Sequence, residues 1–180
     1  KRQHYKELNE PPKLTVLEEV GNAVTHGIGA GLAIAGFVLL LLKSDTGLKV
    51  MASCFYGISL ILMFLMSCLY HSYKSGLAVK RLWRRFDYSS IYLLIGGTFA
   101  PLYLVYWGNV LGIVLFCVQW ALIIVGITII CVFGPGRFRP IHYTLYFVIG
   151  WSAIMFIPGW FRNDKPLLGW ICLLYTSPSP

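Results

Sequence analysis

The chain has 180 residues, of which 57% are apolar and 12% are charged, and its mean hydropathy is +0.69. Soluble domains carry about 25% charged residues, so this composition excludes a soluble enzyme and predicts a membrane protein. The net charge of +8 indicates membrane topology and attraction to anionic lipid headgroups rather than nucleic-acid binding, because the basic residues form no clustered helix with interleaved aromatics.

Long uncharged blocks predict the membrane spans. The chain lacks charged residues over 20–42, 50–73, 88–136 and 140–161. Because about 20 residues cross a bilayer, each shorter block predicts one span and the longest predicts two. We therefore expect an all-α, multi-span helix bundle with spans at about 20–42, 50–71, 87–106, 110–132 and 140–160. The apolar stretch 166–176 is too short to cross and predicts the start of a sixth span.

Around these spans we expect a cytoplasmic N-terminal tail over residues 1–17 and a membrane domain over 18–176. The Ser-Pro run at 177–180 is atypical and predicts a truncated or foreign tail. With the N-terminus inside, eleven Lys and Arg residues are cytoplasmic and four are external. This asymmetry predicts a cytoplasmic N-terminus, and the plasma membrane as the location if the source is bacterial.

Small residues and prolines predict how the spans pack and bend. Gly27, Gly31 and Ala35 recur every four residues on the first span, which predicts close helix packing along that ridge. Gly96 and Gly97 predict a similar approach on the third span. A proline inside a helix removes a backbone donor, so position 101 predicts a kink in the third span.

Polar residues within the spans are the candidates for a functional site, because ionisable groups are costly at membrane depth. They are Glu18, Glu19, Asn22, His26, Ser67, His71, Asp87 and His142. In the predicted topology all of them lie at the cytoplasmic ends of the spans. Residues four apart share a helix face, so Glu18, Asn22 and His26 are expected to stack, as are Ser67 and His71. A histidine near a carboxylate and a hydroxyl fits a metal ligand or a general acid–base pair.

Each candidate also has a structural interpretation. Asp87 could cap the N-terminus of the third helix, and Ser67 could bond the carbonyl one turn back in its own helix. The two glutamates could be partners of the dipole of the first helix. His26 and His142 could hydrogen-bond lipid headgroups or water near the interface.

Three ordered motifs resemble the hemolysin III branch of the progestin and adipoQ receptor family. They are Glu18-Glu19-x-x-Asn22-x-x-Thr25-His26-Gly27, then Ser67-x-x-x-His71, then Asp87-Tyr88-Ser89-Ser90 with the following run to Pro101. Pro140-Ile141-His142 and Gly150-Trp151 also look like that branch. The resemblance covers about residues 18–176 and implies a seven-helix bundle with a cytoplasmic N-terminus.

The resemblance also implies a zinc site near the cytoplasmic side. By analogy, His71 would be a zinc ligand, Asp87 would orient or deprotonate the water at the metal, and Ser67 would hydrogen-bond nearby. Family members with this site take their other ligands from a His-x-x-x-His pair of the seventh span, which we expect to be missing here. This chain would then bind zinc poorly unless His26 or His142 substitutes.

Three classes of function follow. Zinc with an open position is a hydrolytic arrangement, and the wider superfamily includes ceramidases, so the first is hydrolysis of a lipid amide or ester. The second is a receptor or lipid sensor that binds its ligand without turnover. The third is membrane permeabilisation, as the hemolysin name implies. Membrane lipids are the expected partners in each case, and the oligomeric state stays open.

Overall fold

The computed structural model describes residues 7–156, and this part of the chain is helical with no strand. Its long helices are α2 (Val16–Leu42), α3 (Gly47–Ser72), α4 (Ala78–Ala100), α5 (Val110–Phe133) and α6 (Arg139–Trp151). A π-helix continues α4 over Pro101–Trp107, and a 3-10 helix continues α6 over Ser152–Phe156. The predicted all-α fold class is confirmed.

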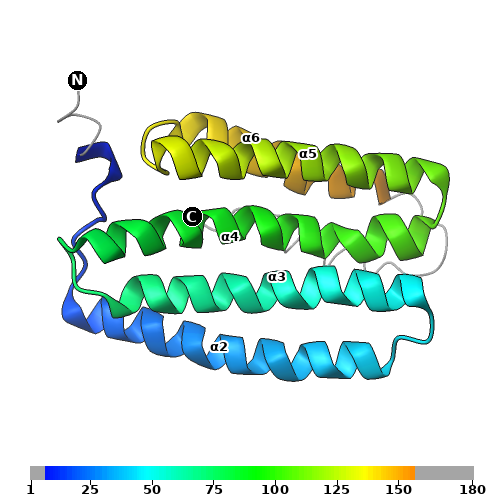
Figure 1. Ribbon diagram of the computed structural model, residues 1–180, viewed down its shortest axis with the longest axis horizontal. Helices are drawn as coiled ribbons and strands as arrows, with labels where there is room; N and C mark the ends of the chain where they lie inside the picture. The colour runs from blue at the N-terminus through cyan, green and yellow to red at the C-terminus, as the bar shows by residue number, and fades with distance from the viewer. Residues whose placement is uncertain (1–6, 157–180) are drawn as a thin grey trace.

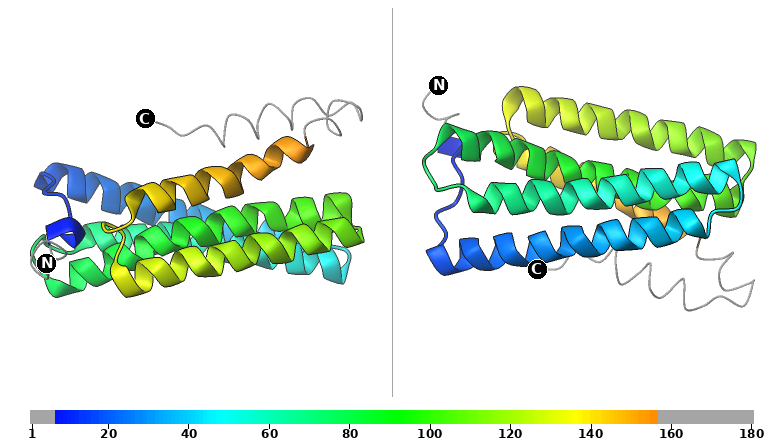
Figure 2. Two further views of the ribbon diagram at one scale, coloured as in Figure 1. Left: turned by 90° about the horizontal axis from the view of Figure 1, so that it is seen from above. Right: turned by 60° about the horizontal axis from the view of Figure 1, so that its bottom comes forward.

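Neighbouring helices run antiparallel along one long axis. Figure 1 shows α2, α3 and α4 side by side in chain order, and both views in Figure 2 agree. α5 packs against α4, and α6 packs against both of them. The start of α2, the end of α3, the start of α4, the end of α5 and the start of α6 therefore meet at one end of the bundle, at the left of Figure 1. We call this the polar end.

The outer surface of the bundle is suited to lipid. α2, α3, α4 with its π-helical extension, and α5 are each long and apolar enough to cross a membrane. Large apolar side chains point outward, with Leu17 83% exposed and Leu32 70% exposed. Such exposure is favourable against acyl chains and unfavourable in water, so the protein is an integral membrane protein. α6 and the 3-10 helix cover the predicted fifth span up to residue 156, while the stretch 166–176 and the tail 177–180 lie outside the described residues.

The third span begins earlier than the sequence predicts, and this corrects two expectations. α4 starts at Ala78, so Asp87 lies inside the helix and does not cap it. The span therefore also begins before its predicted start at about residue 87, and the basic residues Lys80, Arg81, Arg84 and Arg85 lie on the first turns of α4. The uncharged block does not reveal this extension, because it stops at these cations. Two of them, Lys80 and Arg84, are buried and pair with the Glu19 carboxylate and the Glu10 carbonyl.

Close packing between helices occurs at some predicted small residues and not at others. An added Cβ at Gly97 would meet the Ser59 side chain and the Phe55 carbonyl of α3. Gly31, by contrast, has nothing within 4 Å of an added Cβ, so within the described residues the ridge on α2 is not a contact surface at that position. The predicted disturbance at Pro101 takes the form of the π-helix that begins there.

Replacing Gly97 by alanine tests whether α3 and α4 depend on this approach. We expect Gly97→Ala to lower the free energy of unfolding by about 1–3 kcal/mol, because the methyl group has no room. Gly31→Ala is the matched control and should be neutral or slightly stabilising, since alanine favours helix. Thermal unfolding in detergent micelles measures both, and equal behaviour of the two variants would contradict the packing.

Candidate functional site

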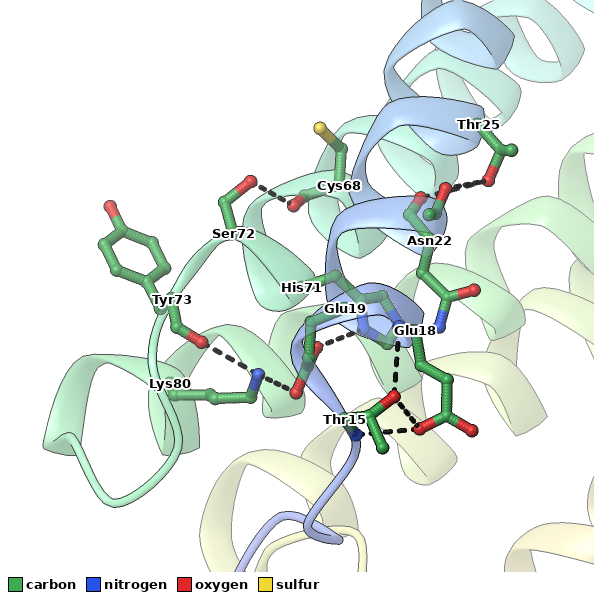
Figure 3. A network of polar contacts seen from close by, with 11 residues as sticks. Thr15, Glu18, Glu19, Asn22, Thr25, Cys68, His71, Ser72, Tyr73 and Lys80 are labelled. Atoms are coloured by element: carbon green, nitrogen blue, oxygen red, sulfur yellow. Dashed lines mark hydrogen bonds and ion pairs between the residues drawn. The ribbon is translucent and has the colours of Figure 1, made fainter.

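A single carboxylate joins three helices at the polar end. Glu19 of α2 accepts a hydrogen bond at Oε2 from the His71 ring, with Nδ1 2.7 Å away, and at Oε1 from the Lys80 ammonium, 2.5 Å away (Figure 3). Lys80 of α4 also donates to the Tyr73 carbonyl at 2.8 Å. The Lys80 side chain is fully buried, and those of Glu19 and His71 are 14% and 12% exposed. Glu19 thus links α2 to the end of α3 and the start of α4.

The start of α2 sets which of its polar residues face inward. Thr15 caps the helix, and its hydroxyl and backbone N–H pair with the Glu18 carboxylate and backbone in a capping box. Glu18 is therefore held at the exposed helix end, which supports its structural interpretation. Because Glu18 points to the cap, the inward face is formed by Glu19 and, two turns later, His26. Glu18, Asn22 and His26 do lie on one continuous helix at spacings of four, but Glu18 stays at the exposed cap and Glu19 makes the contact with His71.

His26 lies beside His71. The two ring centroids are 6.1 Å apart in an edge-to-face arrangement, and the His26 ring also meets Phe64 edge-on at 6.0 Å. Its Nδ1 is buried and has no hydrogen-bond partner. A buried nitrogen without a partner is costly, so this atom is available to a ligand that enters the site.

Asp87 comes to the same place from α4. The Ser67 hydroxyl of α3 hydrogen-bonds its side chain, and the His71 and His26 rings and the Arg84 guanidinium interact with it electrostatically. Ser67 is buried, and its hydroxyl serves the carboxylate of a neighbouring helix rather than its own backbone. Five of the predicted residues therefore meet, and we call them the polar site: Glu19, His26, Ser67, His71 and Asp87.

His142 belongs to a different cluster. Its Nδ1 lies 2.9 Å from the Tyr92 hydroxyl, between α4 and α6, and the nearby Tyr146 hydroxyl donates to the Tyr88 carbonyl at 3.0 Å. The prediction that it could stand in as a ligand beside His71 has no support in this arrangement. It does share the polar end, because α6 begins there.

One residue of the polar site, His71, is well placed to bind zinc, but the five residues together do not form a complete metal site. A metal-binding histidine usually gives one ring N–H to a carboxylate and coordinates through the other nitrogen. The bond from His71 to Glu19 leaves Nε2 of His71 in that role. However, over residues 7–156 no three His, Cys, Asp or Glu side chains are grouped to hold a metal ion. Further ligands would have to come from outside the described part of the chain.

The contribution of Lys80 was not foreseen from the sequence. In the sequence Lys80 is one of several cations that precede an uncharged block, whereas the helix that starts at Ala78 places Lys80, Arg84 and Asp87 on one face. Arg84 is also buried and donates to the Glu10 carbonyl at 2.9 Å. The spacing of Lys80, Arg84 and Asp87, four and then three residues apart, could have identified the two cations, because it places all three residues on one face of a continuous helix.

Comparisons with known proteins agree on one family. The family model described as "Haemolysin-III related" matches residues 14–175. "Hemolysin-3" of Bacillus cereus is 38% identical over 151 residues, which cover 82% of this chain and 68% of the relative. "Hemolysin-3 homolog" of Bacillus subtilis (strain 168) is 33% identical over 144 residues, covering 78% of this chain and 67% of the relative. No solved structure matches the chain.

Removing the bridging carboxylate should destabilise the bundle. Glu19→Ala leaves the buried Lys80 ammonium without its carboxylate, and such a loss costs about 3–5 kcal/mol of unfolding free energy. Glu18→Ala is the control on the adjacent residue and should cost much less, because that side chain is exposed and takes part only in the cap. Unfolding in detergent followed by circular dichroism compares them, and similar losses would show that Glu19 has no special structural role.

Proposed function

Because the chain belongs to the haemolysin-III related family of integral membrane proteins, we propose that its polar site contributes to a zinc centre that hydrolyses an amide or ester bond of a membrane lipid. The contact between Glu19 and His71 is the observation that carries this proposal. A carboxylate at 2.7 Å from Nδ1 fixes the ring and its tautomer and increases the basicity of the other nitrogen.

Zinc in such a site, when bound, acts as a Lewis acid and lowers the pKa of water to about 7. Within residues 7–156 we assign His71 as the zinc ligand. His26 is an accessory candidate, because the centroid of its ring lies 6.1 Å from that of His71. His142 lies in a separate cluster, where its Nδ1 pairs with the Tyr92 hydroxyl and its Nε2 is buried without a hydrogen-bond partner among the described residues, so we do not place it beside His71. The remaining ligands are assigned to parts of the protein outside the described residues.

The other residues of the polar site have roles that follow from their positions. Asp87 is a carboxylate beside two imidazoles, so it can accept a proton from a water molecule and hold that water in place. Ser67 keeps the Asp87 side chain in one orientation by donating its hydroxyl hydrogen. Lys80 keeps Glu19 in its ionised form and thereby keeps Glu19 an acceptor for His71.

The depth of the site suits a lipid substrate. Glu19 and His71 lie within a few residues of the ends of α2 and α3, close to where the spans leave the hydrocarbon. The amide and ester bonds of membrane lipids lie at this interfacial depth. With the N-terminus in the cytoplasm, as the charge asymmetry predicts, the site would act on the cytoplasmic leaflet.

Zinc content and turnover of the full-length protein test the proposal together. We expect His71→Ala to abolish stoichiometric zinc and lipid hydrolysis, and Glu19→Gln to weaken zinc binding by about 10–100-fold. Glu18→Gln, one residue away at the exposed cap, should leave both unchanged. Elemental analysis and an assay with a ceramide and a phospholipid ester provide the measurements. Zinc that is unaffected by His71→Ala would refute the metal assignment, and zinc without turnover would favour a receptor or sensor.

The names of the two Bacillus relatives favour a second candidate function, membrane lysis. If lysis results from lipid turnover, His71→Ala should abolish release of haemoglobin from erythrocytes. Retained lysis by the folded His71→Ala variant would indicate a pore instead, because a pore needs the helices and not the site. Thr25→Ala, on the exposed face of α2, is the control for expression and folding.

A further inference from the structure

A concave surface lies at the polar end, apart from the polar site. It is a cleft of about 740 Å³ between the first turns of α4, the last turn of α5 and the N-terminal segment at Asn9 and Glu10. Three guanidinium groups line it, those of Arg81, Arg85 and Arg137. We call it the arginine cleft.

The N-terminal segment that forms one wall of the cleft is held firmly. Asn9 donates from its side-chain amide to the Phe133 carbonyl at 3.0 Å and accepts from the Gly136 backbone N–H at 3.0 Å. Gly134 has a positive φ of 81°, and a Cβ there would meet the Asn9 side chain. These contacts attach the segment to the turn between α5 and α6, so the cleft is part of the fold.

The charge of the cleft favours an anion. Among the lining residues within 7–156, three guanidinium groups face one carboxylate, Glu10, which accepts a hydrogen bond from Arg81 at 3.1 Å. That pair is exposed, with side chains 40% and 45% accessible, so it is weak and an entering anion can replace it. Arg85 donates to the Cys131 carbonyl at 2.7 Å, which uses one of the five donors of its guanidinium.

The arginine cleft also has an apolar wall. Leu82, Val132 and Phe133 line it together with the arginines and are 49%, 62% and 39% exposed. Arg137 lies over the Phe133 ring at 4.9 Å, so cationic and apolar groups adjoin. Because α4 begins at Ala78 and α5 ends at Phe133, the cationic and apolar side chains of the cleft both lie at helix ends, where the spans leave the hydrocarbon.

We propose that the arginine cleft binds the phosphate of an anionic phospholipid, with Arg81, Arg85 and Arg137 around the phosphate and Leu82, Val132 and Phe133 against the first acyl carbons. Guanidinium groups bind phosphate oxygens through paired, charge-assisted hydrogen bonds. A free phosphate ion shares this chemistry but would not use the apolar wall. The bound lipid would tie the N-terminal segment to α4 and α5.

Binding of fluorescent phosphatidylglycerol to the full chain in zwitterionic detergent micelles tests the cleft. We expect the double variant Arg81→Gln with Arg137→Gln to weaken binding by about tenfold or more. The matched control is Lys74→Gln with Arg139→Gln, which removes the same charge from the polar end outside the cleft. It should weaken binding by less than about threefold.

Unlabelled competitors identify the source of the phosphate. Phosphatidylglycerol should displace the probe, whereas phosphatidylcholine and inorganic phosphate should not. Equal losses in the two double variants would overturn the cleft in favour of diffuse surface charge. Displacement by millimolar inorganic phosphate would overturn the lipid assignment in favour of a free-anion site. If the arginine double variant fails to fold, Glu10→Gln decides: it removes the carboxylate from the cleft and should tighten binding several-fold, and an unchanged affinity refutes the proposal.

Discussion

The arrangement of the first three spans depends on the pairing of one partly buried carboxylate, that of Glu19. An ionised group at the edge of the hydrocarbon is costly unless its charge and its hydrogen-bonding capacity are both satisfied. Glu19 meets this requirement by accepting from His71 on α3 and from Lys80 on α4. The same contact satisfies the Lys80 ammonium, which is fully buried. The pair therefore fixes the relative positions of three helix ends and at the same time orients the histidine of the polar site.

The early start of α4 makes that pairing geometrically available. Because α4 begins at Ala78, Lys80 is on the same rigid helix as Asp87, and the two approach the polar site from one direction. A loop over the same residues would have left Lys80 in solvent and Asp87 at a helix end. The extension also carries Arg81 and Arg85 to the arginine cleft, so the first turns of α4 serve two separate surfaces of the polar end.

The sequence predicted most of the fold and part of the site. Uncharged blocks located α2, α3, the second half of α4, and α5, because the hydrocarbon excludes charge over about 20 residues whatever the neighbouring helices do. The gathering of His26, Ser67, His71 and Asp87 followed from topology and helical spacing. The register of α2 did not, because the capping box at Thr15 uses Glu18 and turns Glu19 inward. His142 shares the polar end with His71, yet it pairs with Tyr92 between α4 and α6.

By itself, the sequence determined that the protein is helical, that it lies in a membrane, and at which end its polar residues gather. These properties depend on composition and on distance along one helix, and both can be read from a single chain. Only the tertiary structure decided which residues meet: Glu19 rather than Glu18 beside His71, Lys80 inside rather than outside, and three arginines around one cleft. Partner choice across helices depends on rotation about each helix axis, and this rotation is tied to contacts such as the Thr15 cap and the buried Lys80, which involve residues of neighbouring segments.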